Sequence, residues 1–116
     1  MNDYSNNINA NIENAVLNAF PFAEEMGKTH ELFKLDTRNF TNDFRKRLSE
    51  QINDCLENDK SINLMFMKAC DKCKGTNYEY EFLNVVAQSP LTPKMAKEYH
   101  AHLAMLRIER GFNVKR

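Results

Sequence analysis

The residues of this chain with the clearest capacity for chemistry are Cys70 and Cys73, which form a C-x-x-C motif. Two thiolates at this spacing can bind zinc or exchange disulfides, but a structural zinc site needs four ligands and a thioredoxin-like pair needs a βαβ context. The only other thiol is Cys55, and no histidine lies at zinc-finger spacing from the pair. On a helix the two cysteines share a face, so we expect them to pack in the core, with metal or redox chemistry as the alternative.

The histidines do not form a catalytic or metal-binding pattern. His30-Glu31 begins like the helix motif of zinc proteases, but Lys34 occupies the place of the second histidine. His100 and His102 lie two residues apart, and such side chains point to different sides of a helix. The three glycines are isolated, so the glycine-rich loop that surrounds nucleotide phosphates is absent. We therefore expect no catalytic residue, no metal and no cofactor.

Composition and charge indicate one globular domain of ordinary size. With 42% hydrophobic and 28% charged residues, 116 residues are enough to bury a core. The sixteen basic and sixteen acidic residues cancel, although the chain is locally basic from Lys94 onward, so we expect direct nucleic-acid binding to be weak at most. The sequence has no secretory leader, no apolar run of about 18 residues and an odd number of cysteines. These features predict a cytoplasmic protein that does not span a membrane.

Apolar residues recur at helical spacing along most of the chain. A first helix is predicted from Ile8 until Pro21 interrupts it, and a short second helix over 22–33. The third helix has an apolar residue at every fourth position: Phe40, Phe44, Leu48, Ile52 and Leu56.

Capping residues mark the last three predicted helices. Ser61 is suited to cap a fourth helix, which stops at Gly75. A T-x-x-E capping box opens a fifth helix over 76–88. Thr92 and Pro93 are the expected start of a sixth helix, which runs to about residue 110.

This succession predicts an all-α fold, a compact orthogonal bundle of about six helices. We expect a single helical domain over 8–112. A disordered Asn-rich tail over 1–7 precedes it, and a short C-terminal tail over 113–116 follows it. No internal repeat or low-complexity linker divides the chain.

The sixth predicted helix carries two apolar stripes on nearly opposite sides. One stripe consists of Met95, Ala96, Tyr99, Leu103 and Leu106. The other consists of Ala101, Met105, Ile108 and Phe112. A helix on the surface of an isolated domain needs only one apolar face, so this helix is either buried at the centre of the domain or covered by a partner. We take the second stripe as the candidate protein interface.

Four segments occur in an order that is characteristic of one protein family. Residues 12–19 match a first-helix pattern (I/A)-E-x-x-(V/A)-L-x-(A/G), and Asn39-Phe40 matches a polar residue followed by Phe before a long helix. Residues 61–64 match the start of the next helix. The apolar run over 82–88 is followed by a break, by a helix with Tyr99 in its second turn, and by a basic and apolar end. In this order the chain resembles the N-terminal domain of the replicative (DnaB-like) DNA helicases.

The resemblance implies a non-catalytic head domain that self-associates as a dimer or higher oligomer and docks primase or a helicase loader during DNA replication. The ATPase of that family lies in a separate C-terminal domain, and its last head helix continues into a hairpin that pairs subunits. By that comparison this chain ends about where the hairpin would turn. The alternative is a free-standing regulator of phage or plasmid type, which mimics the head and binds the host helicase or primase.

Overall fold

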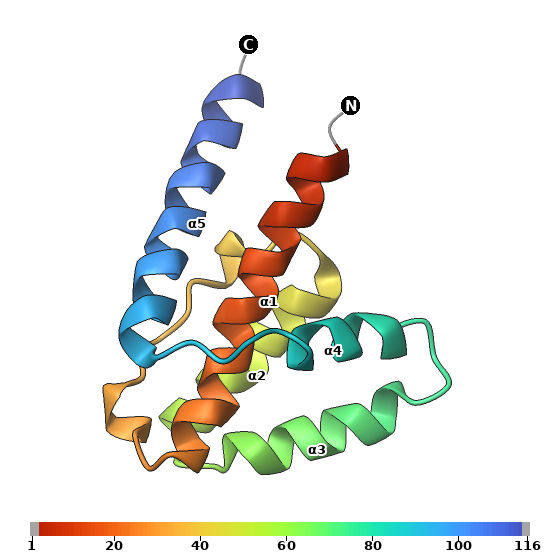
Figure 1. Ribbon diagram of the computed structural model, residues 1–116, viewed down its shortest axis with the longest axis vertical. Coiled ribbons are helices and arrows are strands. Elements are labelled where there is room, and N and C mark those ends of the chain that lie inside the picture. Colours follow the sequence, from red (N-terminus) through yellow and green to blue (C-terminus); the bar gives the residue numbers. More distant parts are fainter. Residues whose placement is uncertain (1–2, 115–116) are drawn as a thin grey trace.

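Five α-helices and two short 3₁₀ helices make up the computed structural model (Figure 1). The structure describes the backbone of residues 3–114 and the side chains of residues 9–111. Over this range the elements are α1 (Asp3–Glu25), η1 (Thr29–Glu31), η2 (Thr37–Asn39), α2 (Asp43–Glu57), α3 (Ile62–Cys73), α4 (Glu79–Val86) and α5 (Pro93–Val114). None of the described residues forms a β-strand, so the all-α prediction is confirmed, with five α-helices in place of about six.

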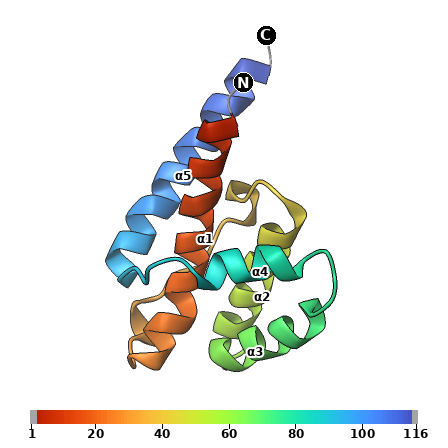
Figure 2. The same cartoon turned by 45° about the vertical axis from the view of Figure 1, so that its right-hand side comes forward.

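Helix α1 is the centre of the fold and contacts each of the other four α-helices. Its residues Val16, Leu17 and Phe20 are completely buried. Helix α5 runs antiparallel along it, whereas α2, α3 and α4 gather around its C-terminal half (Figures 1 and 2). A single buried cluster joins these α1 residues to apolar side chains from every other α-helix.

The prediction that Pro21 ends the first helix is wrong, because α1 continues through it to Glu25. Proline inside a helix costs about 3 kcal/mol through its missing N–H and its steric clash. Phe20 and Ala23, on either side of the proline, are both fully buried, and their burial offsets this cost. The Pro21 carbonyl also accepts a 2.9 Å hydrogen bond from Nδ2 of Asn63 in α3.

The predicted second helix over 22–33 is also wrong, because Gly27 ends α1. Gly27 adopts φ +73°, a left-handed conformation that glycine enters without strain. The Lys28 N–H donates to the Ala23 carbonyl (2.8 Å) and the Gly27 N–H donates to the Glu24 carbonyl (3.0 Å), which is the Schellman pattern. Only the three-residue turn η1 then follows before the chain extends toward η2.

The later helices begin close to their predicted caps. Ser61 Oγ accepts from the Leu64 N–H (3.1 Å) at the start of α3, and Thr92 Oγ1 accepts from the Met95 N–H (3.1 Å) at the start of α5. The third predicted helix begins later than expected, at Asp43, because Phe40 is extended. Its N-cap is Asn42, whose Oδ1 accepts from the Arg45 N–H.

Helix α4 is shorter than predicted, because the capping box does not form as expected. Thr76 Oγ1 accepts from the Tyr78 N–H (3.1 Å), and the Glu79 carboxylate accepts from the Gly75 N–H (3.1 Å). These bonds make a turn, so the helix begins at Glu79. Between residues 3 and 114, no helix is long and apolar enough to cross a bilayer.

Candidate interaction surface

The inner face of α5 combines apolar and polar contacts with the rest of the domain. Ala96 and Leu103 are buried, and Leu106 is half-buried against the core. Met95 and Tyr99, predicted to share this face, are each about 40% exposed, so they lie at its edge. The buried side of the helix instead includes two polar residues, His100 and Arg107, beside Ala96 and Leu103. Both polar residues are half-buried.

The outer face of α5 carries the residues predicted to form an interface. Ala101 is exposed, and the side chains of Met105 and Ile108 are 61% and 53% exposed. At 100° per residue these three lie on the side of the helix opposite Ala96 and Leu103. The fourth predicted member, Phe112, has a side chain outside the described residues. The alternative was a helix buried on both sides. The structure differs from it, because Met105 and Ile108 are exposed.

A polar network fixes the rotation of α5 about its own axis. His100 Nε2 accepts a hydrogen bond from the Asp36 N–H (3.0 Å), and Nδ2 of Asn39 lies 3.1 Å from the same nitrogen. Since a backbone N–H can only donate, Nε2 is unprotonated and the neutral ring carries its proton on Nδ1. The ring packs close to Phe33 and Phe40, with centroid distances of 5.5 and 6.2 Å.

Asp36 and Asn39 extend this network to two arginines. Arg38 donates from Nε (3.0 Å) and Nη2 (2.8 Å) to the Asp36 carboxylate, and these bonds lower the Asp36 pKa to about 2 despite its partial burial. Arg107, two turns along α5 from His100, donates from Nε to the side-chain oxygen of buried Asn39 (2.8 Å). Two points of α5 are thus bonded to η2, and the outer face is held toward solvent.

His100 makes the stability of the domain depend on pH. Burial lowers its pKa from 6.5, an effect that the nearby Asp36 carboxylate partly opposes. The unfolded chain therefore binds a proton at His100 more tightly than the folded chain does. The stabilisation from neutral His100 is fully present above pH 6.5 and is lost as the pH falls toward the lower pKa of the folded state. We expect the urea midpoint to decrease between pH 7.5 and pH 5.5.

The His100→Gln variant should show a smaller decrease over the same range, since glutamine offers an acceptor that does not titrate. The control is His102→Gln, because His102 is exposed and makes no described hydrogen bond. If wild type and His100→Gln lose stability equally on acidification, His100 is not the titrating group.

The cysteines pack against the core as predicted. Cys55 is buried, and Cys70 and Cys73 are half-buried at the margin of the apolar cluster. Burial raises the pKa of Cys55 and of Cys73, and this favours the protonated thiol over the thiolate that metals and disulfides require. Among the described residues, no three His, Cys, Asp or Glu side chains gather closely enough to hold a metal ion.

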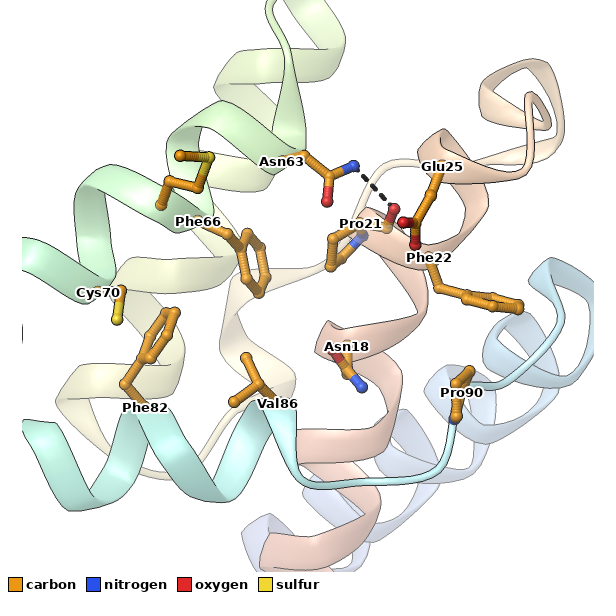
Figure 3. A pocket seen from close by; sticks show the side chains of 11 residues that line it. Asn18, Pro21, Phe22, Glu25, Asn63, Phe66, Cys70, Phe82, Val86 and Pro90 are labelled. Atoms are coloured by element: carbon orange, nitrogen blue, oxygen red, sulfur yellow. Dashed lines mark hydrogen bonds between the residues drawn. The ribbon is translucent and has the colours of Figure 1, made fainter.

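A hollow of about 380 Å³ lies where α1, α3 and α4 meet, and Cys70 is on its wall (Figure 3). The two asparagine side chains in its lining are already bonded within the domain. The Asn63 side chain donates to the Pro21 carbonyl, and Nδ2 of Asn18 donates to the Gln88 carbonyl (2.8 Å). Apart from the exposed Glu25, the remaining lining is apolar.

Sequence reasoning missed the network of Asp36, Asn39, His100 and Arg107. These residues come from two segments more than sixty positions apart, and each is an ordinary polar residue in its own segment. Comparison of the chain with family models, curated proteins and solved structures gives no match.

Proposed function

We propose that this chain is a protein-association domain whose docking surface is the outer face of α5, defined by Ala101, Met105 and Ile108. The observation that carries the proposal is the exposure of two large apolar side chains, each by more than half, on a helix whose inner face is anchored by hydrogen bonds. Apolar residues clustered on one face mark interaction sites more often than single exposed ones do.

The exposed area indicates how strong the association should be. Complete burial of one large apolar side chain contributes about 1.5–3 kcal/mol, and roughly half of Met105 and of Ile108 is already covered. Two copies meeting through this face alone would gain only about 3–6 kcal/mol, near the lower end of the cost of association. We therefore expect weak self-association and a larger interface with a different protein.

The partner is proposed from the family resemblance. Residues 12–19, which carry the first matching pattern, lie in α1, and residues 61–64 form the start of α3. On this basis we propose a non-catalytic head of a replicative helicase, which associates with itself and with primase or a helicase loader. What supports it is the order of these segments together with an all-helical fold.

The test compares two aspartate substitutions on different helices. Ile108→Asp places a charge on the proposed surface, and Leu83→Asp does so on α4 at nearly equal exposure, 50% against 53%. Sedimentation equilibrium over a wide concentration range should show association for wild type and Leu83→Asp and a monomer for Ile108→Asp. Pull-downs with the primase and the replicative helicase of the same cell should show the same pattern.

Two results would contradict the proposal. If Ile108→Asp associates as wild type does, the docking surface lies elsewhere on the domain. If wild type remains monomeric at millimolar concentration and captures neither protein, the helicase-head function is wrong. Circular dichroism of each variant controls for loss of the fold.

A further inference from the structure

We propose that the groove between α2 and α3 binds a short, acidic, amphipathic helix of another protein. The groove lies between α2 and α3, whereas the docking surface proposed above lies on α5, so the two proposals are independent. It has a volume of about 800 Å³, within the range of small-ligand sites.

The floor of the groove is apolar. Leu48 and Cys55 of α2 are buried beneath it, and Met65 and Ala69 of α3 are half-buried beside them. Leu64, at one end of the α3 wall, is 50% exposed. Because these positions recur at helical spacing on both walls, the floor offers a continuous apolar strip on which a partner helix can lay its apolar face.

The rim of the groove is basic. Lys68 and Lys72, one turn apart, follow Leu64 along the α3 wall, and Arg47 lies on the α2 wall. Among the described residues no carboxylate lies within 4.0 Å of these three side chains. The single acidic residue of the lining, Asp54, is already paired with Lys60 at 3.1 Å.

The combination of floor and rim selects the occupant. An apolar strip with cations on both sides complements a helix that has an apolar face flanked by Asp or Glu. The α3 wall from Leu64 to Lys72 spans eight residue steps, about 12 Å at 1.5 Å per step, so two to three turns of partner helix fill it.

Nucleic acid is a poorer fit than an acidic helix. Bases of a single strand need exposed aromatic faces on which to stack. The aromatic rings at the end of the groove already pack on each other, since Phe44 stacks on Tyr78 at 5.8 Å and meets the edge of Phe82 at 6.4 Å.

The probe is a fluorescein-labelled twelve-residue peptide with leucines at helical spacing and glutamates at the other positions. Fluorescence anisotropy measures its binding to wild type, to Lys68→Glu/Lys72→Glu, and to the matched control Lys94→Glu/Lys97→Glu, whose exposed lysines lie on α5. We expect the α3 double variant to bind about tenfold more weakly, because two weak attractions become repulsions, and the α5 control to stay within about twofold.

Further probes separate the apolar from the ionic contribution. A peptide with serines in place of the leucines should not bind, and added salt should weaken the acidic peptide. Amide shifts on binding should fall in α2 and α3 and leave α5 unchanged. The proposal is overturned if wild type does not bind the peptide at millimolar concentration, if the serine peptide binds equally, if both double variants bind alike, or if a single-stranded oligonucleotide binds more tightly and loses its affinity in the α3 variant.

Discussion

Replacement of Arg45 with methionine will lower the free energy of unfolding by about 3–5 kcal/mol, because it leaves the buried Glu13 carboxylate without its cation. The Glu13 side chain is 1% exposed, and its Oε1 receives a 2.6 Å bond from Arg45 Nε. The same carboxylate accepts from the N–H (2.9 Å) and the hydroxyl (2.7 Å) of Thr41, so α1 is joined to the start of α2. Urea denaturation at neutral pH measures the loss.

Two controls show whether the unpaired charge is the cause. Arg47→Met changes an exposed arginine two residues away and should alter stability by less than about 0.5 kcal/mol. The double variant Glu13→Met/Arg45→Met removes both charges and should recover most of the loss, since well-packed apolar side chains replace a buried pair at little cost. A loss below about 1 kcal/mol in Arg45→Met alone would show that water reaches the carboxylate.

Replacement of Glu24 with alanine will destabilise the domain by about 2 kcal/mol, because this carboxylate at the end of α1 caps the first turn of α3. Its Oε2 accepts from the Ile62 N–H (2.8 Å), and its Oε1 accepts from the N–H and the side-chain amide of Asn63 (2.8 and 2.7 Å) and from the Ser61 hydroxyl (3.1 Å). Two otherwise unpaired backbone donors lose their acceptor in the variant.

The effect of Glu24→Ala should depend on pH in a defined direction. Burial alone would raise the pKa of Glu24, but the backbone N–H groups of Asn63 and Ile62 outweigh it and hold the pKa below 4.5. The stabilisation from the ionised Glu24 carboxylate is therefore fully present above pH 4.5 and is lost as the pH falls through the folded-state pKa. The stability difference between wild type and Glu24→Ala should shrink at low pH. Glu25→Ala, at an exposed neighbour, serves as the control and should leave the free energy of unfolding at neutral pH close to that of wild type.

The features predicted correctly from the sequence are those decided within one or two helical turns. Ser61 and Thr92 cap their helices because a hydroxyl and a backbone N–H three residues later are neighbours in any chain. The prediction at Pro21 is wrong because the local penalty of proline is offset by the burial of Phe20 and Ala23, which depends on helices elsewhere in the chain. Gly27 lies within a helical pattern of apolar residues that continues to residue 33. Only the left-handed backbone of Gly27 shows that the helix ends there.

In the candidate surface, too, some features follow from local sequence and others depend on contacts between distant segments. Exposure of Met105 and Ile108 follows from helical periodicity once the opposite face is buried. Which face of α5 is buried depends on His100 bonding to the backbone of Asp36, a contact between distant segments that no local pattern contains. The groove between α2 and α3 likewise arises only when the two helices lie together, so no local pattern indicates that Lys68 and Lys72 line a groove.

The central position of α1 has a consequence for how the protein is made. Synthesis runs from the N-terminus, so Val16, Leu17 and Phe20 are translated well before α5, which covers one side of α1. The side of α1 that α5 covers therefore stays open to chaperones and to other nascent chains until α5 has left the ribosome. Of the contacts that α1 makes with the other helices, the one with α5 closes the longest loop, so we expect the docking of α5 on α1 to be a late step of folding.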